Sequence, residues 1–441
     1  MKTLRKYQEL PYVKGLEQNL LNADDRGLGK TVTSIETARV LMERMSAPVL
    51  IVVPKTLVRQ WHEEIKDQDQ ISPIVIIDTS FQLLQPFNSR KAFWVITHYE
   101  ALVRHQKILA KTFWAVVIAD EAHRIKNRKA QRSSALKKIK AYRKLALTGT
   151  PYDRNPADIW SILNWLRPEI FRSYWAFFQA HVDFDGELDG AKNIKGVKDG
   201  AKFARVTAPY LVQRLKSEVA PQLPTKIQQY IPVQMTHKQA ELYQRIIDIA
   251  EMDLKLDTGE TLLVKNVLGR ILRLQQAAVD PRLLGTDENG AKIDWLLEYI
   301  DDNPNETLLI FTRFRDTAIR IANMLQIPYY VGGIETLTTE MERTPRLVVT
   351  IDAAKEGLNL GHIWNTVFLD QHWSSIAMAQ AMDRTERDLQ ATQPRMIMYL
   401  QAVTAHGSET IDALVRRALS AKWSTTDLVN GYLRAQQDAA K

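Results

Sequence analysis

A glycine-rich stretch near the start of the chain has the composition of a phosphate-binding loop. It reads Asp24-Asp25-Arg26-Gly27-Leu28-Gly29-Lys30-Thr31, and residues that favour a helix follow it. In such a loop, glycines let backbone N–H groups face phosphate oxygens, a lysine neutralises phosphate charge and a threonine hydroxyl holds Mg²⁺. The predicted nucleotide ligands are Asp25, Gly27, Gly29, Lys30 and Thr31. Asp24 stands at the first glycine position of the strict pattern, and a lone Gly-Lys-Thr also fits a helix-capping turn.

Two adjacent carboxylates follow an apolar run further along the chain. Asp120 and Glu121 come directly after Ala115–Ala119, which is typical of a buried strand. Ligands of parallel α/β sheets bind at the carboxyl ends of the strands. There Asp120 would complete the Mg²⁺ coordination, and Glu121 would orient or deprotonate an attacking water. Adjacent acids are also common on solvated turns, and the upstream phosphate loop favours the catalytic interpretation.

A second apolar run ends in small hydroxyl residues. Leu145-Ala146-Leu147 leads into Thr148-Gly149-Thr150-Pro151. This pattern fits an ordinary strand and turn, or a link between hydrolysis and domain movement. In the second case, the hydroxyls of Thr148 and Thr150 would exchange partners between the Asp120 site and a second lobe.

Two arginines near the end of the chain could add positive charge to a nucleotide site. Arg384 and Arg387 are spaced i, i+3, so in a helix they share one face and can reach one anion together. We predict that they are catalytic and act as an arginine finger. The same spacing fits a surface helix with ion pairs to Glu386 and Asp388.

The elements that must position these residues alternate along the chain. Short β-branched runs are followed by helical or loop stretches; they are Val49–Val53, Val116–Ala119, Leu308–Phe311, Leu347–Val349 and Val367–Leu369. The alternation occurs in two blocks, roughly 20–150 and 305–400, and is typical of an α/β fold with parallel sheets. We therefore predict two doubly wound lobes.

The expected domains follow from these blocks. A nucleotide-binding lobe is predicted over residues 1–165, a helical protrusion and loop over 166–222, and a second lobe over 223–441 with a helical protrusion at 237–285. Pro221 and Pro224 mark the boundary because they forbid a continuous helix. Asp183–Gly200, rich in glycine and charge, is predicted to be a flexible loop.

The composition limits the class of protein. The chain has no cysteine, which excludes disulfides, cysteine-based zinc sites and a thiol nucleophile. With 45% hydrophobic and 25% charged residues it fits a soluble globular protein, and no apolar run approaches the ~20 residues that span a bilayer. The first residues lack the pattern of a secretory signal, so a cytoplasmic location is expected.

The charge favours an anionic partner. The formal net charge is +8, and no acidic residue lies between Glu121 and Asp153. This gap holds Arg124, Lys126, Arg128, Lys129, Arg132, Lys137, Lys138, Lys140, Arg143 and Lys144. Such a run fits either a solvated helix face or a patch that follows nucleic-acid phosphates.

Together the motifs resemble the Swi/Snf-type family of helicase superfamily two over nearly the whole chain. The matching segments are Leu4–Gln8 (adenine recognition), Ile51–Ile65 (motif Ia), Val95–Glu100 (Ib), Asp120–Asn127 (II, with the box Asp-Glu-Ala-His), Leu147–Pro168 (III and its continuation), Arg214–Pro224, Ile271–Leu284, Leu309–Phe314 (IV), Ala353–Leu360 (V) and Gln380–Gln390 (VI). In relatives, motifs Ia and Ib lie on the DNA side of the first lobe. The chain departs from the family in three places: a short gap between Gln8 and the phosphate loop, Lys355-Glu356 in motif V, and Glu386 and Leu389 in motif VI.

The resemblance implies an activity and further site residues. It implies two RecA-like lobes with helical protrusions, and a nucleic-acid-dependent ATPase that uses ATP and Mg²⁺. Gln8 would read the base, and Gly357 and Gln380 would couple hydrolysis to movement. The expected partner is duplex DNA, bound through its phosphates by a monomeric motor with no membrane association. The absence of appended reader modules suggests a compact phage or bacterial member, located in the host cytoplasm if from a phage.

Two alternatives to a duplex translocase stay open at this point, and a third fails. A strand-separating or branch-migrating DNA helicase would share all the motor motifs, because they do not identify a wedge. An inactive nucleic-acid-binding scaffold would not require Lys30, Asp120, Glu121, Arg384 and Arg387. A small-molecule kinase would not account for the second lobe.

Overall fold

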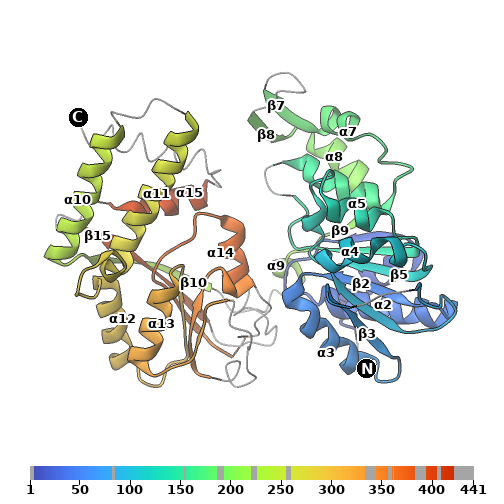
Figure 1. The fold of residues 1–441 in the computed structure, drawn as a ribbon, viewed down its shortest axis with the longest axis horizontal. Helices are drawn as coiled ribbons and strands as arrows, with labels where there is room; N and C mark the ends of the chain where they lie inside the picture. Colours follow the sequence, from blue (N-terminus) through green and yellow to red (C-terminus); the bar gives the residue numbers. More distant parts are fainter. Residues whose placement is uncertain are drawn as a thin grey trace. The chain divides into compact units, whose positions relative to one another are not determined.

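The computed structural model divides into two compact units (Figure 1). Unit 1 covers Met1–Pro221 and unit 2 covers Gln222–Lys441, and we call them lobe 1 and lobe 2. The structure describes residues 4–81, 85–152, 155–185, 193–219, 226–254, 260–332, 344–355, 360, 362–382, 394–404 and 409–421. Among these residues, no helix is long and apolar enough to cross a membrane.

Lobe 1 is built on a seven-stranded sheet in which all neighbouring strands are parallel. The strand order is β3 (Ile74–Ile77), β4 (Trp94–His98), β2 (Val49–Val53), β5 (Trp114–Ala119), β6 (Ala141–Leu147), β1 (Leu20–Asn22) and β9 (Leu211–Val212). Its helices are α1 (Glu9–Glu17), α2 (Lys30–Met45), α3 (Val58–Gln68), α4 (Tyr99–Leu109), α5 (Gln131–Lys137), α6 (Trp160–Leu166), α7 (Tyr174–His181), α8 (Gly200–Thr207) and α9 (Lys216–Val219).

The strands of this sheet are buried on both faces because their side chains alternate between two cores. Leu50 and Val52 of β2 pack in one core with α4, α5 and α6. Ile51 and Val53 pack in the other core with α2 and α3. A strand that is covered on both faces needs apolar residues at every position, which accounts for the continuous β-branched runs of the sequence.

Lobe 2 repeats this plan with a six-stranded sheet, again parallel between all neighbours. The strand order is β10 (Lys226–Gln234), β15 (Arg395–Val403), β14 (Asn365–Phe368), β11 (Leu308–Thr312), β13 (Arg346–Thr350) and β12 (Tyr329–Tyr330). Its helices are α10 (His237–Leu254), α11 (Glu260–Val279), α12 (Ala291–Asp302), α13 (Arg315–Leu325), α14 (Ser375–Met382) and α15 (Ile411–Ser420). The predicted fold class, two doubly wound α/β lobes, is confirmed.

The two faces of the second sheet also have separate cores. Ile310 of β11 packs with α12 and α13, and Phe311 packs with α14. Helices α10, α11 and α15 share a third core beside the sheet. In Figure 1, α10 and α11 stand out from this lobe as a helical pair, at the position expected for a protrusion.

The segment after the first lobe's last motif contains more than helices and loop. β7 (Val182–Asp185) and β8 (Asn193–Val197) form an antiparallel hairpin, so the prediction of a flexible loop over Asp183–Gly200 was wrong for these strands. Apolar Phe184 and Ile194 pack on Phe178 and Val182, which stabilises the hairpin despite the surrounding glycine and charge. Further along, β9 joins the main sheet beside β1.

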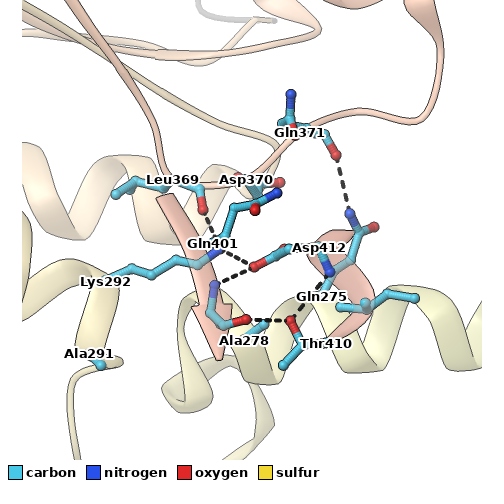
Figure 2. Close-up of polar contacts among 12 residues, drawn as sticks. Gln275, Ala278, Ala291, Lys292, Leu369, Asp370, Gln371, Gln401, Thr410 and Asp412 are labelled. Carbon is cyan, nitrogen blue, oxygen red and sulfur yellow. Dashed lines mark hydrogen bonds and ion pairs between the residues drawn. The ribbon is translucent and has the colours of Figure 1, made fainter. Parts of the chain in front are cut away.

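A buried ion pair joins four elements of lobe 2 (Figure 2). Lys292 of α12 is fully buried; its Nζ donates to the carbonyl of Leu369 at 2.7 Å and lies 2.6 Å from Oδ2 of Asp412. The same carboxylate oxygen accepts the backbone N–H of Ala402 at 2.8 Å. The lysine therefore connects α12 with α15, the end of β15 and the residue that follows β14.

Candidate nucleotide-binding site

Three loops with predicted functional residues meet at one edge of the first sheet. They follow β1, β6 and β5, which are consecutive neighbours in the sheet. Because these strands are parallel, with Asn22 beside Leu147 and Ala119 beside Ala146, their carboxyl ends lie together. The phosphate loop, Asp120-Glu121 and Thr148–Thr150 therefore line one site, where α/β folds bind their ligands.

The backbone of the phosphate loop adopts left-handed conformations at its two glycines. Gly27 and Gly29 have φ of +79° and +77°, in the left-handed region that residues with a Cβ avoid. Gly29 is the N-cap of α2, so the helix starts at Lys30 with Thr31 in its first turn. The Lys30 ammonium donates to the carbonyls of Asp24 at 2.6 Å and Asp25 at 3.1 Å.

Gln8 lies directly against the phosphate loop. Its amide Nε2 donates to the carbonyl of Leu28 at 3.1 Å, and its Oε1 accepts the N–H of Arg5 at 2.9 Å. A Cβ on Gly29 would lie only 2.2 Å from this Nε2. The short gap between Gln8 and the loop therefore does not separate them, and the site includes the glutamine.

Asp24 forms an ion pair with a residue near the end of the lobe 1 sequence. Its buried carboxylate pairs with the guanidinium of Arg214, which follows β9. Two backbone contacts accompany this pair: the Asp25 N–H donates to the Arg214 carbonyl, and the Lys216 N–H donates to the Asp25 carboxylate, each at 2.9 Å. The aspartate at the glycine position thus anchors the loop to the β9 segment, and Asp25 serves this anchor as well.

Asp120 is fixed by two aromatic side chains. The Trp61 indole N–H donates to Oδ2 of Asp120 at 2.8 Å, and the Tyr99 hydroxyl donates to the Asp120 carbonyl at 2.7 Å. Burial, followed by the charge of Glu121, raises the pKa of Asp120 to about 6, although the Trp61 hydrogen bond lowers it. The carboxylate is therefore strongly oriented and in an environment that favours a bound cation.

These two aromatics were missed as site residues. Trp61 and Tyr99 belong to the motif Ia and Ib segments, which relatives place on the DNA side, yet both side chains are buried. Their polar tips need a partner when the rings are buried, but nothing in the sequence indicates which residue that partner is.

Glu121 has a strained backbone. Its φ of +47° and ψ of +50° place it in the left-handed region. The other described non-glycine residues with positive φ are Ser46 and Gln326, and they end helices α2 and α13. Glu121 instead precedes a short 3-10 helix, and this strain is typical of residues at functional sites.

His123 connects Glu121 to the Thr148 turn. Its Nδ1 lies 3.1 Å from Oε2 of Glu121 and 3.3 Å from Oγ1 of Thr148. Burial raises the pKa of Glu121, but the His123 hydrogen bond and the charges of His123, Arg26 and Lys30 outweigh it and lower the pKa to about 2. Thr148 Oγ1 accepts the Thr150 N–H at 3.2 Å, so both predicted coupling threonines are part of this network.

The residues at this edge fit ATP and Mg²⁺. Two left-handed glycines at a helix N-terminus expose N–H groups, and the Lys30 ammonium is held on loop carbonyls from which phosphate oxygens could displace it. Arg26 adds two buried guanidinium nitrogens that have no hydrogen-bond partner. Gln8, Gly27, Gly29, Lys30 and Thr31 would hold the nucleotide, and Thr31 and Asp120 the cation.

Most predicted residues of lobe 2 lie outside the described part of the chain. Gly357, Arg384 and Arg387 are not among the described residues, and of Gln380 only the backbone, in α14, is described. Their predicted roles stay predictions.

Motif IV lies where β11 and β14 end side by side. The Arg313 N–H donates to the buried carboxylate of Asp370 at 3.0 Å, and its guanidinium donates to Gln275 and lies 4.0 Å from the Trp373 ring centre. Gln275 also donates to the carbonyl of Gln371 at 3.1 Å, as Figure 2 shows. Within lobe 2, this network ties α11 to both strand ends.

Part of the basic run of lobe 1 stabilises the fold. Arg143 donates to the Leu16 carbonyl at 2.7 Å and Lys144 to the Trp165 carbonyl at 2.8 Å, so these residues stabilise the fold. The exposed members of the run are Lys126, Lys129, Lys138 and Lys140. For these lysines, a solvated face and a phosphate-binding patch both stay open.

Fold and site together define a two-lobe protein with a phosphate loop and a paired-carboxylate site. Residues 10–283 match the family model of the SNF2-related domain. The chain belongs to this family, and the resemblance read from its motifs is confirmed.

Two relatives illustrate the match. The chain is 26% identical over 425 residues to the mouse "SWI/SNF-related matrix-associated actin-dependent regulator of chromatin subfamily A member 1", covering 87% of this chain and 40% of the relative. It is 26% identical over 438 residues to the Saccharomyces cerevisiae "ISWI chromatin-remodeling complex ATPase ISW2", covering 90% of this chain and 39% of the relative. The chain thus spans well under half the length of these relatives.

Two solved structures from Sulfolobus solfataricus are also similar. The "SWI2/SNF2 ATPase core in complex with dsDNA" is 24% identical with a TM-score of 0.46, over 91% of this chain and 88% of that one. The "SWI2/SNF2 ATPase core domain" is 22% identical with a TM-score of 0.45, over 98% of this chain and 94% of that one.

Proposed function

We propose that this chain is a DNA-dependent ATPase motor that uses Mg²⁺-ATP to move along duplex DNA. Membership of the SNF2-related domain family supports this function. The observation that carries it is the placement of Glu121, with its low pKa, beside Asp120 at the phosphate loop of Lys30. An ionised carboxylate beside a cation-binding partner at a phosphate loop can orient the water that attacks a phosphoanhydride.

Each residue of the site has a defined task in this proposal. Bound Mg²⁺-ATP supplies the phosphoanhydride bond and the cation that neutralises its charge. Lys30 and the loop N–H groups bind phosphate oxygens, Thr31 and Asp120 hold the cation, and the Glu121 carboxylate orients or deprotonates the attacking water. His123 positions that carboxylate through its contact at 3.1 Å.

Coupling to movement would pass through the threonine turn. His123 contacts both Glu121 and Thr148, so a change at the carboxylate alters the hydrogen bonds of the turn. Arg384 and Arg387 would complete the site from lobe 2 as arginine fingers, with Gly357 and Gln380 transmitting the change. Hydrolysis would then depend on closure of the lobes.

Duplex DNA would be bound mainly through its phosphates. The family supports this partner, and the exposed lysines Lys126, Lys129, Lys138 and Lys140 offer the positive charge. Such binding weakens steeply with salt and has little sequence preference. A monomeric motor, a cytoplasmic location and a phage or bacterial source are parts of the same proposal.

The first test is ATPase activity with and without nucleic acid. Wild type should hydrolyse ATP faster with duplex DNA, whereas Lys30→Ala should lose nucleotide binding and Glu121→Gln should bind nucleotide and DNA without turnover. Glu63→Gln removes an exposed carboxylate of α3 and should behave as wild type. Activity that is indifferent to DNA, or that survives in Glu121→Gln, contradicts the proposal.

The same measurement addresses an inactive scaffold. A scaffold would bind DNA with salt-dependent affinity and show no ATP hydrolysis on duplex, single-stranded or branched DNA, or on RNA. Stimulation by one of these nucleic acids rejects the scaffold and identifies the preferred substrate.

A strand-separating or branch-migrating helicase is the second candidate, because it shares every motor motif. A triplex-displacement assay beside a strand-displacement assay separates the two functions. Displacement of a third strand without separation of the duplex supports the translocase, and separation of the duplex supports the helicase.

A further inference from the structure

The phosphate loop carries a second cationic side chain, Arg26, whose position points into the site. A Cβ on Gly149 would lie 3.0 Å from Cγ and 3.4 Å from Nε of Arg26, so the arginine stem runs along the backbone of the threonine turn. Arg26 therefore extends from the phosphate loop toward the turn that follows β6.

The end of this side chain has no partner. Nη1 and Nη2 of Arg26 are both buried and make no hydrogen bond. No ion pair within 4.0 Å joins the guanidinium to a carboxylate of the described residues. A guanidinium has five N–H donors and cannot lose its charge, so leaving it buried and unpaired is costly.

Two other arginines of lobe 1 have carboxylate partners, which Arg26 lacks. Arg39 of α2 is held by Glu36 at 2.7 Å and Glu43 at 2.6 Å, and Arg214 pairs with Asp24. In both cases the guanidinium has a carboxylate partner in the chain itself. An arginine without such a partner, at a loop that binds anions, is suited to an anion that comes from solution.

The position of Arg26 defines which part of a nucleotide would reach it. Its stem lies against Gly149 of the threonine turn. His123 joins this turn to Glu121, since its Nδ1 lies 3.3 Å from Oγ1 of Thr148 and 3.1 Å from Oε2 of Glu121. The guanidinium thus lies on the side of the loop where the threonine turn is found, which is the side proposed for bond cleavage.

We propose that Arg26 is a second cation of the phosphate site, which binds the terminal phosphate of a nucleoside triphosphate and so favours triphosphate over diphosphate. This inference rests on the proposed function, because it assumes that the loop binds nucleotide. The planar fork of arginine donates two parallel hydrogen bonds to a phosphate, whereas Lys30 supplies a compact charge. Because Arg26 packs against Gly149, a movement of the threonine turn would also move the Arg26 side chain.

The test measures nucleotide affinity on the whole chain without turnover. A fluorescent non-hydrolysable ATP analogue and fluorescent ADP, each with Mg²⁺, are titrated into wild type, Arg26→Met and Arg26→Lys. We expect Arg26→Met to bind the triphosphate about 10- to 100-fold more weakly, because a charged hydrogen bond is lost, while its affinity for ADP changes less than about threefold. Arg26→Lys should recover part of the loss.

Two controls keep the result interpretable. Arg44→Met removes an exposed arginine at the far end of α2 and should leave both affinities unchanged. Thermal unfolding without nucleotide should show Arg26→Met at least as stable as wild type, since the variant removes an unpartnered buried charge. If Arg26 only packs against Gly149, Arg26→Met should instead have a lower unfolding temperature, and its affinity for both nucleotides should fall equally.

The outcomes are separable from those of the proposed function. Equal weakening of both nucleotides in Arg26→Met, or unchanged affinity for the triphosphate, overturns the role of Arg26 while leaving the ATPase intact. If wild type binds neither nucleotide, or if Lys30→Ala binds both as wild type does, the proposed function itself fails.

Discussion

The indole N–H of Trp61 donates to Oδ2 of Asp120 at 2.8 Å, which links the start of α3 to the end of β5. The other carboxylate oxygen, Oδ1, accepts the Glu121 N–H at 2.9 Å. Both oxygens are therefore oriented by the protein before any cation binds. Groups that orient a metal-binding carboxylate in this way strongly affect metal affinity and activity.

Trp61→Phe should raise the Mg²⁺ concentration needed for half-maximal ATPase activity about 10- to 100-fold. The phenyl ring fills most of the buried space but cannot donate a hydrogen bond to Asp120. The measurement is a Mg²⁺ titration of DNA-stimulated ATPase at saturating ATP.

Trp94→Phe is the matched control. Trp94 is also buried in lobe 1, and its indole donates to Oδ2 of Asp69 at 2.7 Å. Both variants should lose about 1–3 kcal/mol of stability, because each leaves a carboxylate short of one donor. If the Mg²⁺ requirement rises equally in both variants, the rise is caused by the lower stability of lobe 1 and not by the loss of the hydrogen bond to Asp120.

Arg214→Met should destabilise lobe 1 by about 3–5 kcal/mol, since it leaves the buried carboxylate of Asp24 without its partner. Guanidinium denaturation followed by tryptophan fluorescence measures the loss. Lys195→Met is the comparison: it breaks the Lys195–Asp185 pair of the β7–β8 hairpin, whose side chains are 55% and 58% exposed, and should change the stability little because solvent screens this pair. Similar costs for the two variants would contradict the anchoring role of Arg214.

Lys292→Met should destabilise lobe 2 by about 3–5 kcal/mol, because the Asp412 carboxylate is then buried without a cation. Lys292→Met combined with Asp412→Asn should be more stable than the single variant. The amide oxygen still accepts the Ala402 N–H, and no charge stays buried. Chemical denaturation measures both proteins, and a double variant no more stable than the single one refutes this account.

Gly29→Ala should lower the unfolding temperature and abolish nucleotide binding. The left-handed φ of +77° costs about 1–2 kcal/mol for a residue with a Cβ, and the added Cβ would lie 2.2 Å from Nε2 of Gln8. Combining it with Gln8→Ala removes the clash and should restore part of the unfolding temperature. Gly200→Ala is the control, because its Cβ would meet nothing within 4 Å. If the double variant has an unfolding temperature no higher than that of Gly29→Ala, a clash with Gln8 is not the cause of the destabilisation.

The sequence was sufficient to predict the lobes and the meeting of the loops. Continuous β-branched runs identify strands that are buried on both faces, and the carboxyl ends of parallel neighbours must share one edge. This is why Lys30, Asp120 and Thr148 could be assigned to one site before their positions were known.

The partners of these residues could not be predicted, because they depend on tertiary packing. Arg214 reaches Asp24 across 190 residues of chain, and Trp61 reaches Asp120 across 59. Neither pair leaves a local pattern in the sequence. The β7–β8 hairpin was missed for another reason: its few apolar residues are interrupted by glycine and charge, which resemble a loop.

β9 comes last among the strands of the lobe 1 sheet in the sequence, which affects how this lobe folds during synthesis on the ribosome. The phosphate loop is made before the strand and the arginine that brace it, and Arg214 follows Asp24 by 190 residues. At about 5–20 residues per second, the loop would wait roughly 10 to 40 s for its brace. During synthesis, the Asp24 carboxylate is therefore without its arginine for that time, and the phosphate loop reaches its anchored form only after the β9 segment has been made.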